Sequence, residues 1–105
     1  MKTAIYLLIA TVALPSFSFG MTGAELLQAD RNFASGYVLG VVDARTGIYI
    51  ENDPNQIQLR ECITNAKLTS STLYDVVADY LRRNPKDLPA PAMGAVVKVL
   101  NEMCL

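Results

Sequence analysis

The chain has 105 residues, with nine lysine and arginine residues, ten aspartate and glutamate residues and no histidine, for a formal net charge of −1. A charge this close to neutral provides no electrostatic basis for binding nucleic acid or anionic lipid. Without histidine, the chain lacks the ordinary serine–histidine–aspartate and cysteine–histidine catalytic arrangements, and its two cysteines do not have the spacing of a zinc site. We therefore expect a protein that is not an enzyme and binds no metal or cofactor.

The N-terminal segment 1–20 has the pattern of an export signal. Lys2 supplies a positive charge, an apolar run extends from Ala4 to Leu14, and Pro15 and small residues follow at a plausible cleavage site. The apolar run is about half as long as the roughly 20 residues that a membrane-spanning helix needs. We expect 1–20 to be a cleaved signal peptide and 21–105 to be one exported domain with no membrane anchor.

A short first helix is predicted directly after this segment. Thr22 precedes Glu25 by three residues, so the hydroxyl group and the carboxylate can each accept a hydrogen bond from a free backbone N–H group. This capping box predicts that a helix begins within the stretch TGAELLQA.

A second, longer helix is predicted from about Asn32 to Ile50. A segment of this length without a turn signal is long for a strand, although its β-branched residues would suit one. Apolar side chains recur at helical spacing along one stripe, which neighbouring residues widen: Phe33, Tyr37, Val41 and Ala44, with Val38, Val42 and Tyr49.

Three residues of this second helix are expected to shape its packing. Gly36 and Gly40 are four residues apart, so they would leave one face free of side chains and let a neighbouring helix approach closely. A homodimer could use the same face. Asp43 lies in an otherwise apolar segment, and we expect it either at the polar edge of the packed helix, paired with Arg45 or a neighbouring helix, or in contact with a partner.

The segment Glu51–Gln58, with the sequence ENDPNQIQ, is predicted to be an exposed loop. It contains the turn-forming residues asparagine, aspartate and proline and almost no apolar side chains. It is either a simple connector or a surface for a partner, and in the second case the contacting residues would be Asn52, Asp53, Asn55 and Gln56.

The last two predicted helices follow the first cysteine. Thr69 is the expected N-cap of one of them, and Asn84 and Pro85 end it. Its apolar residues lie at i, i+3, i+4, i+7 and i+8, which places Val76, Val77 and Tyr80 in the core beside Leu73 and Leu81. The final helix is expected to start near Pro91, with a stripe formed by Met93, Val96, Val97 and Leu100. Helices without a convincing strand predict an all-α fold, a small bundle of about four helices.

The two cysteines are expected to form a disulfide. An oxidising compartment permits a bond between Cys62 and Cys104, and a small domain benefits from a cross-link because its core is small. In the chain-entropy model, closing a loop of this length stabilises the fold by about 4 kcal/mol. A reactive thiol is the alternative, and the absence of histidine and of a Cys-x-x-Cys motif disfavours it.

Several segments, in order and spacing, resemble the Rap/Tai family of small periplasmic immunity proteins. They are GYVLGVVDA from Gly36, CI at Cys62, LTSSTLYDVVADYLRRNP and PAMGAVVKVLNEMC. The resemblance covers residues 33–104. It implies an α-helical protein with disulfides that is exported to the periplasm and blocks the active site of a type VI secretion amidase, an enzyme that cuts the peptide part of peptidoglycan.

The chain departs from the family pattern at two places. Many members have a further pair of cysteines, where this chain has the stretch ELLQAD and Ala34, and the usual proline after CI is Thr64 here. The loss of both extra cysteines together is consistent with pairing between the remaining two. A less constrained first helix could serve a different toxin.

The hypothesis is therefore a non-enzymatic periplasmic immunity protein whose partner is a cognate toxin, a peptidoglycan amidase. The alternative is a small periplasmic helical chaperone or stress protein. A bundle that binds a small molecule is a third possibility, but the sequence shows no cluster of inward-pointing polar residues to support it.

Overall fold

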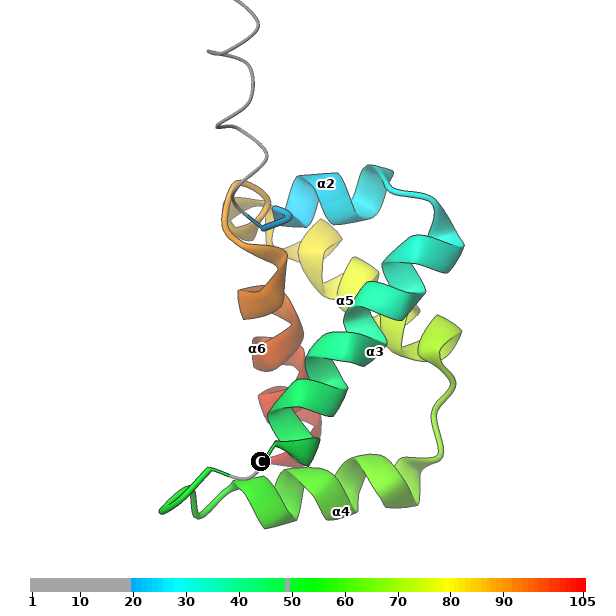
Figure 1. Ribbon diagram of the computed structural model, residues 1–105. Helices are drawn as coiled ribbons and strands as arrows, with labels where there is room; N and C mark the ends of the chain where they lie inside the picture. Colours follow the sequence, from blue (N-terminus) through cyan, green and yellow to red (C-terminus); the bar gives the residue numbers. More distant parts are fainter. Residues whose placement is uncertain (1–19, 49) are drawn as a thin grey trace, which may run out of the picture.

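The computed structural model describes residues 20–48 and 50–105, and these residues form an all-α fold, as predicted. The elements are α2 (Gly23–Gln28), α3 (Arg31–Gly47), α4 (Gln56–Ala66), α5 (Ser70–Arg83), the short 3-10 helix η2 (Pro85–Asp87) and α6 (Ala92–Cys104). In Figure 1, α3 crosses in front of α5 beside α6, and α2 and α4 lie across opposite ends of this three-helix layer. The predicted signal peptide, except Gly20, lies outside the described residues.

The main core lies where α3, α5 and α6 meet under α2. Helix α5 buries most of the predicted stripe, including Val77 at 1% exposure and Tyr80 at 6%, and Val76 is half-buried against the same core. Of the three residues predicted for the core, Val77 and Tyr80 thus lie in it and Val76 packs against it. In α6 the buried face is Ala92, Ala95, Val96, Val99 and Leu100, whereas the predicted Met93 is 56% exposed.

Helix α2 is fastened to the bundle through its N-terminal backbone. The predicted capping box is present, with Thr22 and Glu25 each accepting a backbone N–H group of the other. Two further N–H groups of the first turn, those of Gly23 and Ala24, donate to carbonyl groups in the segment between η2 and α6. A Cβ atom on Gly23 would lie 2.7 Å from a side-chain carbon of Leu81 and 3.0 Å from the backbone oxygen of Asp87, so this close approach favours glycine.

Helix α3 buries only part of the predicted stripe. Val38 and Val42 are buried and Tyr37 and Val41 are half-buried against the core, but Ala44 is exposed. The buried row is Ala34, Val38, Val42 and Thr46, with Ser35 beside it, whereas Phe33 is 59% exposed. Small residues at the start of the buried row let α3 pack closely against α5 and α6, and the bulky ring of Phe33 stays outside. The helix also ends at Gly47, three residues earlier than predicted, and Tyr49 lies outside the described residues.

The packing role predicted for Gly36 and Gly40 is wrong. Both glycines are exposed, and a Cβ atom added to either would meet no atom within 4 Å. The exposed face of α3 that carries them is not covered by another helix of the described chain, because α5 and α6 pack on the opposite side.

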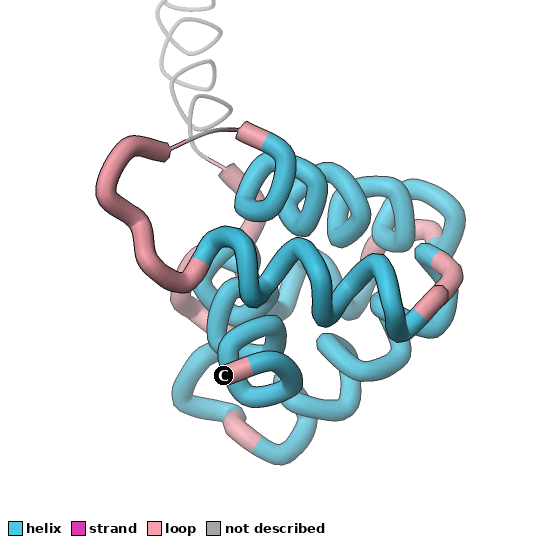
Figure 2. Tube along the Cα trace, turned by 90° about the horizontal axis from the view of Figure 1, so that it is seen from below, coloured by secondary structure: helices cyan, strands magenta, loops and turns pink. Residues whose placement is uncertain are grey.

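Helix α4 was not expected from the sequence. The segment predicted as a loop becomes helical at Gln56, and the helix continues through Cys62 to Ala66 (Figure 2). Its pattern is short, with Leu59, Cys62, Ile63 and Ala66 at helical spacing. Lys67, with a φ of 52°, then ends the helix in the left-handed conformation.

None of the helices within residues 20–48 and 50–105 is both long enough and apolar enough to span a membrane.

Candidate protein-recognition site

A cleft and a projecting loop lie between α3 and α4. The α3–α4 loop, residues 48–55 with residue 49 outside the described chain, projects from the α4 end of the bundle (Figure 1). Together with the first turns of α4 it borders an open cleft of about 460 Å³. The cleft is lined by Ile50, Asn52, Asp53, Pro54, Gln56, Ile57 and Arg60.

Gln56 holds the two sides of the loop together. Its side-chain oxygen accepts a hydrogen bond of 3.1 Å from the N–H group of Ile50, and its side-chain nitrogen donates to the carbonyl group of Ile48. Gln56 itself is 3% exposed. The prediction that it is an exposed loop residue in contact with a partner is therefore wrong, because its amide group is used inside the protein.

A second fastening joins the loop to α3. The Arg45 guanidinium lies 2.9 Å from the Asp53 carboxylate, and both side chains are mostly buried. The other oxygen of Asp53 accepts the N–H group of Asn55 at 3.0 Å, which closes a tight turn. Arg45 thus pairs with Asp53 and not with Asp43, which is exposed on α3.

A third fastening joins α4 to the end of α3. Nε of Arg60 donates to the carbonyl group of Thr46 at 2.8 Å, and the Thr46 hydroxyl donates to the carbonyl group of Val42. Carbonyl groups in the last turn of a helix have no partner within the helix, so Arg60 supplies one from outside. Asn52 adopts the left-handed conformation with a φ of 64°, which asparagine tolerates better than most residues.

These fastenings leave a defined set of side chains facing solvent. Asn52 and Asn55, two of the predicted contact residues, are exposed. The isoleucines around them were not predicted as contact residues. The one feature of the sequence that could have indicated them is that they recur at intervals within a polar segment. We call the exposed side chains of Ile48, Ile50, Asn52, Asn55 and Ile57 the recognition surface; the three isoleucines are 63%, 46% and 65% exposed.

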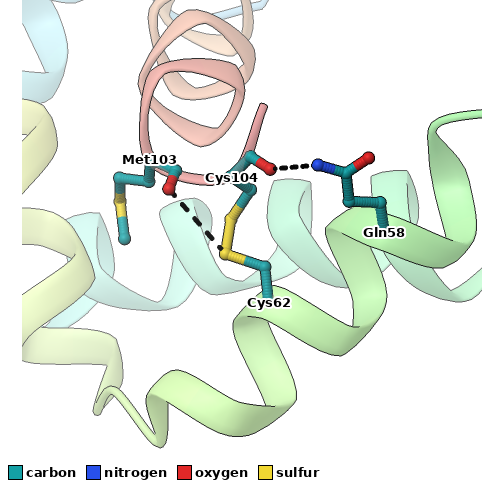
Figure 3. The surroundings of a disulfide bond; sticks show 4 residues. All are labelled: Gln58, Cys62, Met103 and Cys104. Atoms are coloured by element: carbon teal, nitrogen blue, oxygen red, sulfur yellow. Dashed lines mark hydrogen bonds between the residues drawn. A yellow bond between two sulfur atoms is a disulfide. The ribbon is translucent and has the colours of Figure 1, made fainter.

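The predicted disulfide is present and anchors the helix behind the recognition surface. Cys62 near the middle of α4 is bonded to Cys104 at the end of α6, with Cα atoms 5.7 Å apart (Figure 3). The side-chain amide of Gln58 donates to the carbonyl group of Cys104 at 2.8 Å. The position of α4 is thus set from the α6 side as well as from α3.

Two carboxylates on the exposed face of α5 form ion pairs with arginines. Asp75 on α5 pairs with Arg31 at 2.7 Å, and Asp79 pairs with Arg83 one turn further along the same helix. Within the described part of the chain, no three histidine, cysteine, aspartate or glutamate residues lie close enough together to hold a metal ion.

The fold and the site define a class: a small helical protein in which hydrogen bonds and an ion pair hold a surface loop with exposed apolar side chains. The family model of the Rap1a immunity proteins matches residues 18–104, and the chain belongs to this family. No curated protein and no solved structure matches the chain. Membership indicates a role in immunity to a toxin, as an inhibitor rather than an enzyme.

Proposed function

We propose that this protein is a periplasmic immunity protein that binds a peptidoglycan amidase toxin delivered by type VI secretion and blocks its active site. The observation that carries the proposal is the recognition surface, in which apolar side chains are exposed on the α3–α4 loop and the first turn of α4, which three contacts hold to each other and to α3. The export pattern of residues 1–20 and the disulfide both favour the periplasm, because disulfides persist in oxidising compartments.

A fastened loop is suited to tight binding for an entropic reason. Ordering a flexible loop on association costs free energy, about 0.5–1.5 kcal/mol for each side chain that is immobilised. The contacts made by Gln56, Asp53 and Arg60 already order the loop when the protein folds. Less free energy is therefore lost to ordering when the complex forms. Exposed isoleucines at the centre of such a surface would supply apolar contact area, with Asn52 and Asn55 as hydrogen-bonding groups beside them.

The proposal is tested by survival and by affinity. Cells that export the amidase to the periplasm should lyse, and co-expression of this protein should rescue them. In calorimetry with the purified amidase, Ile57→Ser should raise Kd by about tenfold to a hundredfold, because it removes apolar contact worth about 1.5–3 kcal/mol. Met93→Ser, at an apolar residue that is 56% exposed at the opposite end of the molecule (Figure 1), should leave Kd within about twofold of the native value.

Equal effects of the two substitutions would place the contact elsewhere. Failure of the native protein both to rescue cells and to bind the amidase would refute the proposed function. A chaperone would instead suppress aggregation of unrelated unfolded proteins and would show no preference for the amidase.

A further inference from the structure

Arg60 is the charged group of the cleft that has no carboxylate partner among the described residues. The other charged residue that lines the cleft, Asp53, is neutralised by Arg45 at 2.9 Å. None of the ion pairs formed within residues 20–48 and 50–105 includes Arg60. The exposed carboxylates nearest to it in sequence, Glu61 and Glu51, do not line the cleft. The cleft therefore presents an uncompensated positive charge.

The guanidinium group of Arg60 is also held in place. Its Nε donates to the Thr46 carbonyl group at 2.8 Å, which fixes the plane of the group against the end of α3. A guanidinium has five N–H donors, and those on its two terminal nitrogens have no acceptor among the described residues. Two parallel N–H groups in a fixed plane match the two oxygens of a carboxylate.

The remainder of the lining is largely apolar. Ile50 and Ile57 are exposed at the cleft, and Pro54 lies between them in the sequence. An oriented cation beside an apolar surface complements a ligand that has a carboxylate beside an apolar side chain. A protein segment supplies both groups from neighbouring residues.

We propose, building on the proposed function, that the cleft binds a segment of the toxin in which an aspartate or glutamate side chain lies next to an apolar side chain. The carboxylate accepts hydrogen bonds from the terminal nitrogens of Arg60, and the apolar side chain packs against Ile50 and Ile57. Arg60 is thus a specificity-determining residue, since a toxin without this carboxylate leaves the guanidinium unpaired in the interface.

The first test measures affinity with the purified amidase at low and at high salt. Arg60→Gln should raise Kd by about tenfold to a hundredfold at low salt, the usual effect of losing a hydrogen bond to a charged group. Arg60→Lys should recover part of the affinity, because an ammonium group keeps the charge without the parallel pair of donors. Arg82→Gln is the matched control: it removes the same charge from an exposed site on α5, and its Kd should stay within about twofold of the native value.

The second test identifies the carboxylate. Each aspartate and glutamate on the amidase surface is replaced by its amide, and each variant is titrated with the native protein and with Arg60→Gln. One replacement should weaken binding of the native protein by about tenfold or more but have little further effect on binding of Arg60→Gln.

Two outcomes would overturn the inference alone. In the first, the native protein binds the amidase while Arg60→Gln binds as tightly as Arg82→Gln. In the second, Arg60→Gln weakens binding but no carboxylate of the amidase is coupled to it. Absence of any binding by the native protein would instead overturn the proposed function, and this inference with it. Circular dichroism of each variant establishes that a weaker affinity does not reflect unfolding.

Discussion

Gln56 shows how one side chain can set the shape of a loop. Its amide group carries both a donor and an acceptor, and these match the Ile48 carbonyl group and the Ile50 N–H group on the two sides of the loop. A buried amide is tolerated when its hydrogen bonds are made. The polar amide group that makes Gln56 look like an exposed residue in the sequence therefore joins the two sides of the loop inside the protein.

Replacing Gln56 should loosen the loop more than it disturbs the bundle. We expect Gln56→Ala to lower the free energy of unfolding by about 1–3 kcal/mol, because two buried hydrogen bonds are lost. Hydrogen exchange of the Ile50 amide should become faster, and Kd for the amidase should rise. Gln28→Ala, at an exposed position of α2, should change stability by less than about 0.5 kcal/mol. Unchanged exchange at Ile50 would show that Gln56 does not hold the loop.

Among the elements, α4 depends most on its cross-link. An isolated helix as short as α4 is marginal in water, so its stability must come from tertiary contacts. Only Gln56 and Leu59 are buried within it, and Ile63 is half-buried against the main core. The disulfide at Cys62 therefore fixes a helix that has little apolar area of its own to hold it.

Removing the disulfide should affect α4 before the rest of the bundle. The double variant Cys62→Ser and Cys104→Ser should lose about 4 kcal/mol of unfolding free energy, the chain-entropy value for a sequence separation of 42 residues. Hydrogen exchange should become faster in α4 than in α3 and α5, and affinity for the amidase should fall.

Reduction of the native protein with dithiothreitol is the matching control and should reproduce these changes. Amides of α4 that stay as protected as those of α5 in the double variant would show that packing alone holds the helix.

At the scale of the whole molecule, the bundle is fastened at both ends. At the α2 end, the buried carboxylate of Asp87 accepts a hydrogen bond of 2.7 Å from the Tyr80 hydroxyl and lies 3.3 Å from the Lys98 ammonium group. This cluster joins α5, η2 and α6. The hydrogen bond to Asp87 raises the pKa of Tyr80 to about 12, and the same bond, aided by Lys98, lowers the pKa of Asp87.

These pKa shifts predict a stability profile that falls at both pH extremes. The pKa of Asp87 is lower in the folded state than the unfolded value of about 3.9, so its contribution is present above about pH 4 and is lost as pH falls through the folded pKa. The folded pKa of Tyr80 is about 12 against about 10 unfolded. Its contribution is therefore present below about pH 10 and is lost as pH rises toward 12.

Urea unfolding midpoints measured from pH 2 to pH 12 would test this profile. Tyr80→Phe should flatten the alkaline decline and weaken the acid decline, because the shared hydrogen bond is gone. Tyr37→Phe, a half-buried tyrosine on α3, should keep the native profile. An alkaline decline of the same size in Tyr80→Phe would assign it to another group.

Features set by neighbouring residues were predictable, and features set by packing were not. The capping box of α2 and the Thr69 N-cap of α5 each follow from residues three apart, and both are present. The buried face of α3 was predicted only in part. Val38 lies in the core as expected but Phe33 is exposed, because the two look equally suitable as core residues until the neighbouring helices are in position. Helix α4 was missed because its apolar pattern is short and follows a run of turn-forming residues.

The sequence by itself determined that the chain forms helices, where the clearest of them begin and end, and that its two cysteines pair. Helical periodicity and helix caps depend on residues that are close together in the sequence, and two cysteines allow only one pairing within the chain. Only the tertiary structure decided which residues of the α3–α4 loop face solvent. Asp53 and Gln56 turn inward because Arg45, Ile48 and Ile50 satisfy their polar atoms, and these partners are six to eight residues away. Whether a polar side chain is exposed depends on whether the fold supplies partners for it, and that is settled only when the segments come together.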